Sequence, residues 1–232
     1  FIKPDTRNLE NVVAVKGKLL DRIKDLDEIP SPYLTGLLDK FFDGNLTPFL
    51  ETNRGCPFTC TFCHTGDFYF HKLNKFSENR VKEEIEYIAK KAGKLGITNL
   101  HLADVNFGMY PTDRKTCEFF LESKEKYKWP LQIIGTTGKN AKERVMEITG
   151  ILGDMFVVNM AMQSLSETVL QNIARANIKL EHMDTINEHL IKEGRNTHGE
   201  LILPLPGETK KSFVDGLNIM LNSNVTSVCI YT

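Results

Sequence analysis

The sequence has no long apolar run and almost no net charge. None of its hydrophobic stretches approaches the roughly 18 residues of a membrane-spanning helix, and nothing in it resembles a signal peptide. Its 29 basic and 30 acidic residues are scattered and leave a formal charge of -1, so no overall basic field is present to attract nucleic acid. We therefore expect a cytoplasmic protein with neither a membrane nor a nucleic-acid partner.

Cysteine is also scarce, with five residues in all. Because this number is odd and no secretory segment is visible, a framework of disulfides is not expected. Cys117 and Cys229 lie in apolar surroundings, and we interpret both as buried small hydrophobic residues. The chain begins at Phe1 and stops at Thr232 inside an apolar, strand-like run, so we expect it to be a fragment of a longer protein.

The other three cysteines crowd into one short string, CPFTCTFC, as Cys56, Cys60 and Cys63. Thiolates are the soft ligands that hold iron-sulfur clusters, and a compact loop can direct three of them at three irons of one cubane. The fourth iron then has no protein ligand nearby. Such an open position lets a metal centre bind a small molecule.

Two other interpretations of this string stay open. A zinc site would need a fourth ligand, for which His71 or Asp67 is a candidate, although no second CxxC or HxxxH pair accompanies it. An iron-sulfur electron-transfer module or a structural metal-binding module would instead close the site with an external ligand. Both alternatives predict a metal centre that does not respond to a small-molecule cofactor.

The cysteine spacing, together with Phe62 before the last cysteine, resembles the motif of the radical S-adenosylmethionine (SAM) superfamily. The resemblance implies a 4Fe-4S cluster whose open iron chelates the amino and carboxylate groups of SAM. It further implies that one electron from the reduced cluster cleaves SAM to methionine and a 5′-deoxyadenosyl radical. An electron donor such as flavodoxin or ferredoxin would then be a partner, beside a small-molecule or still unidentified substrate.

From about residue 48 onward, short apolar runs alternate with amphipathic helical patterns, which is typical of β-α units and a parallel sheet. Ser77, Ser166 and Thr209 are expected helix N-caps. The family resemblance implies a partial (β/α)6 TIM-like barrel over residues 48–232. Residues 1–47 differ in character, with three prolines and charge-rich stretches, and we interpret them as an irregular leader packing on the barrel. Six strands are predicted, at Pro48–Asn53, Thr98–Asp104, Leu131–Gly135, Phe156–Met162, Gly199–Leu205 and Ser227–Tyr231.

Part of the leader, LDEIPSPYLTGLLDKFF, resembles the segment that joins a cobalamin-binding domain to the radical SAM domain in the cobalamin-associated branch of the superfamily. This implies a cobalamin-dependent methyltransferase or a related radical-modifying enzyme whose cobalamin is bound by a domain outside this chain. No cobalamin-ligating DxHxxG motif occurs here. A purely structural leader is the alternative for these residues, and a methylthiotransferase-like enzyme is the alternative within the family.

Sites in β/α barrels lie where the strands end, and the resemblance places contacts to SAM there. Asp104 and Asn106 occupy the position of a glycine-rich motif that bonds the SAM amino group. Gln163 and Ser164 are expected at its ribose or methionine end, and Arg175 is a candidate for its carboxylate, which suits a guanidinium fork.

Two apolar residues complete the predicted SAM site. Phe62 is expected to lie near the adenine, and the string GELILPLPGET resembles a segment whose backbone lies against it, which implicates Leu203. Pro204 stands where the family usually has glycine. Glu200 is a carboxylate within this otherwise apolar strand, and the sequence does not decide whether it faces a ligand or solvent. No catalytic side chain can be assigned from the sequence.

Overall fold

A six-stranded parallel sheet forms the centre of the computed structural model, which describes residues 17–138 and 142–232. Its strand order is β1-β4-β5-β6-β7-β8, and each neighbouring pair is parallel. The α/β fold and its partial TIM-like arrangement are confirmed. The strands are β1 (Phe49–Leu50), β4 (Asn99–Phe107), β5 (Gln132–Thr137), β6 (Phe156–Gln163), β7 (Thr197–Ile202) and β8 (Ser227–Tyr231).

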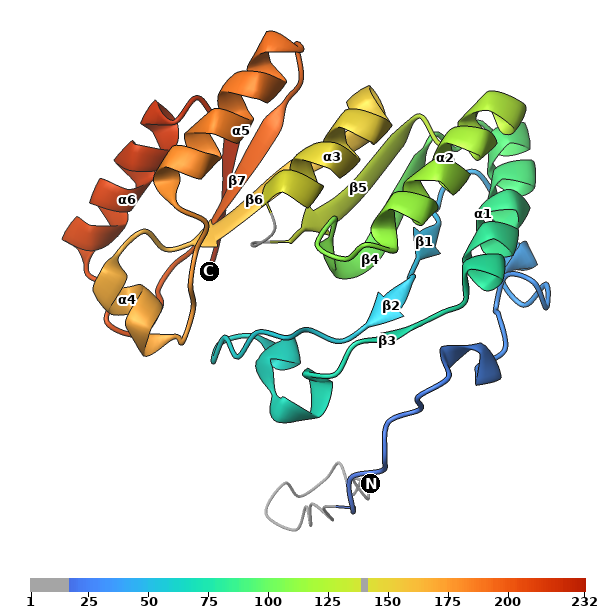
Figure 1. Ribbon diagram of the computed structural model, residues 1–232, viewed down its shortest axis with the longest axis horizontal. Helices are drawn as coiled ribbons and strands as arrows, with labels where there is room; N and C mark the ends of the chain where they lie inside the picture. The colour runs from blue at the N-terminus through green and yellow to red at the C-terminus, as the bar shows by residue number, and fades with distance from the viewer. Residues whose placement is uncertain (1–16, 139–141) are drawn as a thin grey trace, which may run out of the picture.

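The first strand is shorter than predicted. After Leu50 the chain leaves the sheet, and β2 (Asn53–Arg54) pairs antiparallel with β3 (Asn74–Lys75). This small ribbon was not predicted from the sequence. Its two strands lie at the two ends of the segment 55–73, which carries Cys56, Cys60 and Cys63 and is called the cysteine loop below (Figure 1). The loop therefore starts and ends at one fixed pair of strands.

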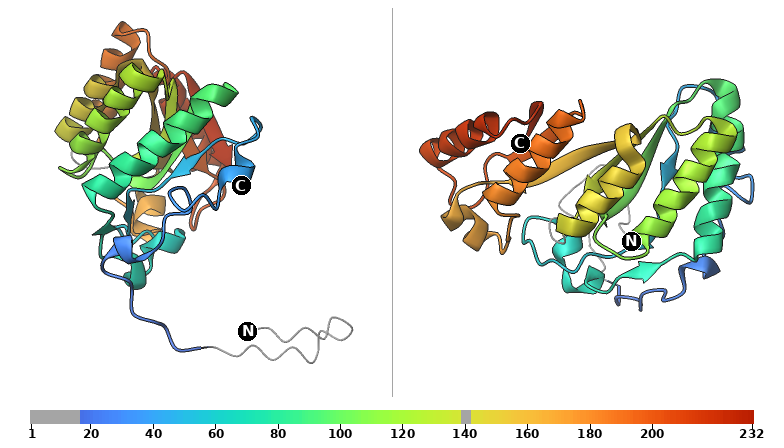
Figure 2. Two further views of the ribbon diagram at one scale, coloured as in Figure 1. Left: turned by 90° about the vertical axis from the view of Figure 1, so that its right-hand side faces the viewer. Right: turned by 45° about the horizontal axis from the view of Figure 1, so that its top comes forward.

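Helices follow the strands and cover one face of the sheet (Figures 1 and 2). The three predicted N-caps are confirmed: Ser77 accepts from the N–H of Arg80, Ser166 from that of Val169, and Thr209 forms a capping box. The helices are α1 (Glu78–Ala92), α2 (Asp113–Tyr127), α3 (Lys142–Leu152), α4 (Glu167–Asn172), α5 (Leu180–Lys192) and α6 (Lys210–Asn222).

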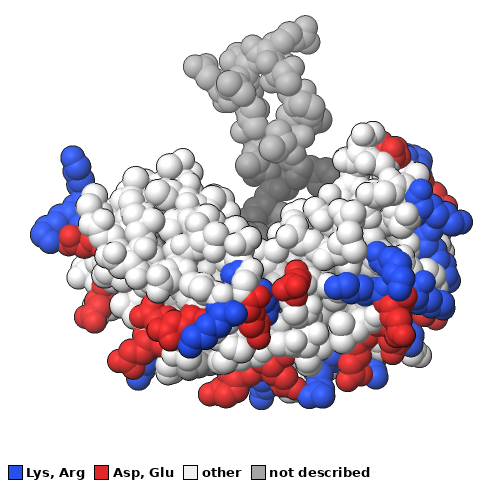
Figure 3. All heavy atoms as spheres, turned by 90° about the horizontal axis from the view of Figure 1, so that it is seen from above, with Lys and Arg blue, Asp and Glu red and all other residues white. Residues whose placement is uncertain are grey.

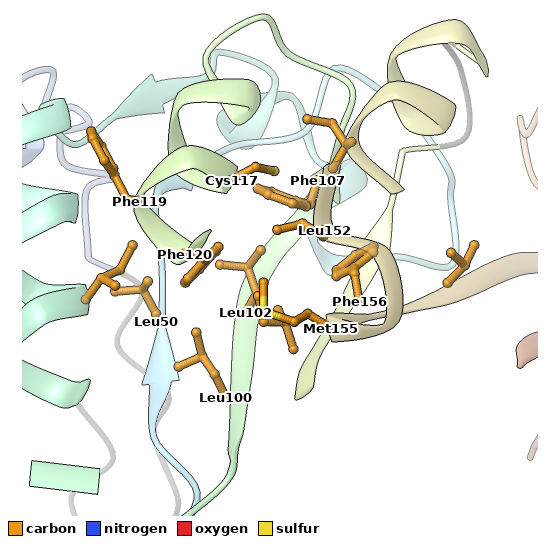
Figure 4. Packing of buried hydrophobic residues seen from close by; sticks show 14 of the residues in the cluster. Leu50, Leu100, Leu102, Phe107, Cys117, Phe119, Phe120, Leu152, Met155 and Phe156 are labelled. Atoms are coloured by element: carbon orange, nitrogen blue, oxygen red, sulfur yellow. The ribbon is translucent and has the colours of Figure 1, made fainter. Parts of the chain in front are cut away.

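The core lies between the sheet and these helices. Leu100, Leu102 and Phe107 of β4 are buried on the helix side, where Phe120 of α2 and Met155 pack nearby (Figure 4). Burying each such side chain contributes about 1.5–3 kcal/mol to the free energy of unfolding. The residues that alternate with Leu100 and Leu102, such as Ala103 and Val105, are only half-buried and face the inner side of the sheet, which leaves that side free for a site.

The described part of the leader is held against α1 by a buried polar contact. The hydroxyl of Ser31 donates to Glu84 at 2.5 Å, and Arg80 pairs with the same carboxylate at 2.7 Å. Arg80 also donates to the carbonyl of Ile29 at 3.2 Å. Residues 1–16 of the predicted leader lie outside the described residues.

The two remaining cysteines differ in their surroundings. Cys117 is fully buried in α2, as predicted, and burial raises the pKa of its thiol. The prediction for Cys229 was wrong, because this residue is exposed on β8. β8 is the last strand of the sheet and is exposed along most of its length, so apolar neighbours in the sequence do not bury it.

Charge is distributed as the composition predicts. Figure 3 shows basic and acidic side chains interleaved along one margin of the molecule, with much of the remaining visible surface uncharged. Within the described part of the chain, no helix is long and apolar enough to cross a membrane.

Candidate functional site

One cavity of about 220 Å³ is lined by all three cysteines of the loop. Cys56 and Cys60 are buried, whereas Cys63 is exposed. Four neighbouring strands contribute to the inner wall of the cavity, with Asn106 from β4, Thr136 from β5, Met160 from β6 and Glu200 from β7. The cysteine loop follows β1 and β2, so the cavity lies where β/α barrels place their sites.

Backbone hydrogen bonds hold the cysteine loop. The N–H of Cys56 donates to the carbonyl of Phe70 at 2.9 Å, and that of Thr61 donates to the carbonyl of Ile173 at 3.0 Å. Gly66 lies so close to the loop that a Cβ atom there would be 2.2 Å from the carbonyl oxygen of Cys60. Only glycine fits this approach without moving the backbone.

Each cysteine sulfur has a hydrogen-bonding side chain beside it. The Nδ2 of Asn106 lies 3.3 Å from the Sγ of Cys56, and the hydroxyl of Thr65 lies 3.2 Å from the Sγ of Cys63. A guanidinium nitrogen of Arg175 lies 4.0 Å from the Sγ of Cys60. Each of the three sulfurs therefore lies next to a side chain that can donate a hydrogen bond to it.

The donor set fits a cluster better than a single ion. Within residues 17–138 and 142–232, no group of three or more His, Cys, Asp or Glu side chains is arranged to hold one metal ion. The two proposed fourth zinc ligands do not line the cavity. Asp67 instead caps a 3-10 turn by accepting from the N–H of Tyr69 at 2.8 Å. Three sulfurs that line one cavity but do not converge on one point suit three irons of a cubane.

Four of the seven residues predicted to contact SAM line this cavity, namely Phe62, Asn106, Gln163 and Arg175. Gln163 has a left-handed backbone, with φ of 66°, at the end of β6. The Oε1 atom of its side chain is buried and has no hydrogen-bond partner among the residues that the structure describes. A non-glycine residue held in this conformation, with an unsatisfied polar atom beside a cavity, is typical of a binding site.

The structure does not bring Asp104 to the cavity. This residue is 1% exposed and lies on the helix side of β4, in line with Leu100 and Leu102. Its carboxylate accepts from the N–H of Thr52 at 2.8 Å, from the Thr52 hydroxyl, and from Nδ2 of Asn53 at 2.7 Å. Burial raises the pKa of Asp104 to about 7, although these hydrogen bonds oppose the shift. Its carboxylate therefore anchors the chain before the cysteine loop.

Ser164 and Leu203 do not line the cavity either. The hydroxyl of Ser164 donates to Glu208 at 2.9 Å, and the backbone N–H of Leu203 donates to the carbonyl of Tyr231 at 2.7 Å. Ser164 directly follows β6 and Leu203 directly follows β7, and their hydrogen bonds connect the ends of these strands to other parts of the chain.

The predicted site residues did not include Thr65, Thr136 or Glu200, all of which line the cavity. Glu200 accepts hydrogen bonds from Nδ2 of Asn159 on β6 and from the hydroxyl of Tyr231 on β8. A carboxylate inside an apolar strand was the available signal for Glu200. Thr65 carried no such signal, because its role depends on the short turn that follows Cys63.

A second cavity of about 460 Å³ adjoins the first. The leader forms one wall of it, and Tyr69 and Phe70 form another; Thr65 and Val105 line both cavities. An occupant of the second cavity would therefore lie next to the cysteine site.

Comparison with known proteins supports this description. The sequence profile of the Radical SAM superfamily matches residues 50–218. The chain is 33% identical over 231 residues to the cobalamin-dependent radical SAM methyltransferase TokK of Streptomyces tokunonensis, covering 94% of this chain and 32% of that protein. It is also 33% identical over 219 residues to the 2-(S-pantetheinyl)-carbapenam-3-carboxylate methyltransferase of Streptantibioticus cattleyicolor, covering 90% of this chain and 32% of that protein. The chain thus spans about a third of the length of these relatives.

Solved structures show the same fold at low sequence identity. The radical SAM methyltransferase TsrM of Kitasatospora setae, solved with tryptophan and a SAM analogue, superposes with a TM-score of 0.66 at 16% identity, over 84% of this chain and 37% of that one. The cobalamin-dependent SAM radical enzyme OxsB superposes with a TM-score of 0.64 at 18% identity, over 89% of this chain and 30% of that one.

Proposed function

Because this chain belongs to the radical SAM superfamily, we propose that it is the catalytic core of a cobalamin-dependent methyltransferase. The observation that carries the proposal is the convergence of three cysteines on one cavity bounded by neighbouring parallel strands. The relatedness to methyltransferases over more than nine-tenths of the chain supports the choice of reaction. Cobalamin, the methyl acceptor and the electron donor are part of the proposal.

In the proposed site, Cys56, Cys60 and Cys63 would hold a 4Fe-4S cluster. A reduced cluster held there would supply one electron for the cleavage of SAM to methionine and a 5′-deoxyadenosyl radical. Gln163 offers its unpaired Oε1 atom to SAM, while the apolar walls, such as Met160, exclude water from reactive species. The chain thus provides positioning and protection, and the cofactors provide the radical chemistry.

The leader supports a role for cobalamin. Residues of the leader form one wall of the second cavity, which adjoins the cysteine site at Thr65 and Val105. A corrinoid held by another part of the parent protein, or a small-molecule acceptor, would reach SAM from this side. The exposed Cys63 gives an electron donor such as flavodoxin or ferredoxin a short path to the cluster.

The first experiment is electron paramagnetic resonance on anaerobically reconstituted, reduced protein, recorded with and without SAM. We expect a cubane signal whose g-values change when SAM is added, together with 5′-deoxyadenosine detected by mass spectrometry. The Cys60→Ala variant, which lacks one ligand, is expected to lose both. A cluster signal that SAM does not alter would instead support an electron-transfer or structural module.

Whether cobalamin is the second cofactor must be tested with the intact parent protein. We expect that protein to bind cobalamin, seen by its visible absorbance, and to transfer a methyl group from SAM. A parent protein that contains further iron-sulfur clusters and no cobalamin would contradict the proposal and favour a methylthiotransferase.

A further inference from the structure

We propose that Asn106, Arg175 and Thr65 are positioning residues that set the reduction potential of the cluster, each through a hydrogen bond to a different cysteine sulfur. The inference rests on the proposed function, since it requires that the cysteines hold a cluster. It gives Asn106 and Arg175 a role other than the contact with SAM that the family resemblance implies for them.

The contact between Asn106 and Cys56 is shielded from water. Asn106 is 3% exposed and Cys56 is 7% exposed, and Nδ2 of the one lies 3.3 Å from Sγ of the other. The register of β4 against β5 shifts between Leu102 and Phe107, and Asn106 lies within this irregular stretch. Because both side chains are nearly fully buried, water competes less for this contact than for the one at the exposed Cys63, so we expect Asn106 to influence its sulfur strongly.

The guanidinium of Arg175 is fixed by two other bonds that leave one nitrogen for Cys60. Its Nε donates to Oδ1 of Asn177 at 2.7 Å, and one terminal nitrogen donates to the carbonyl of Ala161. Asn177 is itself held by a 2.8 Å bond to the carbonyl of Ser164. The other terminal nitrogen then lies 4.0 Å from Sγ of Cys60. Because arginine stays charged in proteins, a fixed positive charge lies beside the cluster.

Thr65 makes the third contact at the surface. Its hydroxyl lies 3.2 Å from Sγ of Cys63, which is exposed. Water can take over this bond when the hydroxyl is removed. We therefore expect Thr65 to influence the potential less than Asn106 or Arg175.

Reduction adds one electron, and hence negative charge, to a cluster and its sulfur ligands. Donors and positive charges beside these sulfurs stabilise the reduced state more than the oxidised one, and hydrogen bonds to sulfur are among the factors that set cluster potentials. Removing a donor must then make the potential more negative. The cluster would become harder for the electron donor to reduce.

The test is a redox titration of the reconstituted protein without SAM, followed by electron paramagnetic resonance. We expect Asn106→Leu and Arg175→Met each to shift the reduction equilibrium about tenfold toward the oxidised state, which for one electron is about 59 mV. Thr65→Val is expected to shift it less, and Arg175→Lys, which keeps the charge, is expected to recover part of the Arg175→Met loss. Thr136→Val is the matched control, because Thr136 lines the cavity but contacts no cysteine sulfur in the hydrogen bonds of the described residues.

The outcomes separate this inference from the proposed function. Unchanged potentials in both Asn106→Leu and Arg175→Met, with normal iron content, would overturn the inference while leaving the cluster intact. A wild-type chain that assembles no cluster would overturn both. If Asn106→Leu binds no iron, Asn106→Ser, whose side chain is too short to reach the sulfur, is titrated in its place with the same expected direction.

Discussion

The carboxylate of Asp104 accepts hydrogen bonds from both the backbone N–H and the hydroxyl of Thr52, which directly precedes β2. This contact fixes the chain four residues before Cys56, at the point where it leaves the sheet. A residue that the sequence placed beside SAM thus supports the cysteine loop from the opposite side of β4.

The buried Asp104 carboxylate should make stability depend on pH. Its pKa is raised from an ordinary value of 3.8 to about 7, mainly by burial, so between these values the folded state binds more protons than the unfolded state. The free energy of unfolding should therefore fall as the pH rises through this window, by about 2–3 kcal/mol between pH 5 and pH 7. Urea unfolding of the wild type at several pH values measures this slope.

Asp104→Asn is the control for this slope, because the amide does not titrate. Its stability at low pH is expected to be below that of the wild type, since an NH2 group replaces an acceptor facing the donors of Thr52 and Asn53. The difference between the two proteins should shrink as the pH rises. Parallel pH profiles would show that Asp104 is already ionised throughout this range.

Gly66→Ala should prevent correct formation of the cysteine loop. The new Cβ would lie 2.2 Å from the carbonyl oxygen of Cys60, so the backbone must shift, and one ligand shifts with it. We expect the reconstituted protein to lose most of its iron, measured by colorimetric iron analysis, while its circular dichroism stays that of the wild type.

Gly150→Ala is the matched control for this substitution. Gly150 lies in α3, and a Cβ there would meet no atom of the described residues within 4 Å outside the backbone of its own helix. Alanine should stabilise this helix by about 0.5–1 kcal/mol and leave the iron content unchanged. Normal iron content in Gly66→Ala would show that the loop tolerates a side chain at this turn.

Arg80→Met should destabilise the fold because it leaves the buried carboxylate of Glu84 without its charged partner. Arg80 and Glu84 form an ion pair whose side chains are only 12% and 8% exposed. Without Arg80, Ser31 would be the one side chain of the described residues that still bonds this carboxylate. Removing one partner of a buried pair costs about 3–5 kcal/mol, which chemical denaturation can measure. Limited proteolysis should also cleave the leader sooner, because Ile29 loses its bond to Arg80.

Lys82→Met tests whether this effect depends on burial. Lys82 pairs with Glu122 at a similar distance of 2.7 Å, but the two side chains are 41% and 55% exposed. Exposed pairs contribute about 1 kcal/mol or less, so this variant should remain close to the wild type. Equal losses in the two variants would contradict the buried role of Arg80.

Gln163→Gly should separate binding from folding. Glycine adopts the left-handed conformation of this position without strain, which offsets its larger entropy loss on folding, so stability should change by less than about 1 kcal/mol. Loss of the carboxamide should weaken SAM binding about tenfold, as expected for one hydrogen bond of about 1.4 kcal/mol. Calorimetric titration of cluster-loaded protein with SAM provides the measurement.

Gln163→Asn is the companion variant. Asparagine tolerates the left-handed region and keeps an amide, although a shorter one, so its SAM affinity should lie between those of the wild type and Gln163→Gly. A Gln163→Gly variant with wild-type affinity would show that the unpaired Oε1 atom does not contact SAM.

Short-range sequence patterns were sufficient to predict the strands of the sheet and the starts of three helices. The caps at Ser77, Ser166 and Thr209 are short-range contacts, and the apolar runs of the sheet need only their own periodicity, so both were visible without a structure. The direction of Asp104 was also available, because it shares its alternation with Leu100 and Leu102. The family motif assigned Asp104 to SAM by its position in the chain, without regard to the face of the strand on which it lies.

Other parts of the site depend on contacts that leave no such pattern. The register shift in β4 near Asn106 has no sequence signature that distinguishes it from a regular strand. The two-residue strands β2 and β3 are too short to show periodicity. Thr65 lies beside its sulfur only because of the turn His64–Gly66, so its role is set by tertiary structure.

The bond from Thr61 to Ile173 joins the cysteine loop to a residue more than a hundred positions later in the chain. Contacts of such long sequence separation form late in folding, since a large loop must close first. During synthesis the three cysteines leave the ribosome well before Ile173 and Arg175, and their final arrangement waits for α4. We therefore expect the cysteine site to be completed only after the fourth strand of the sheet and the helix that follows it have folded.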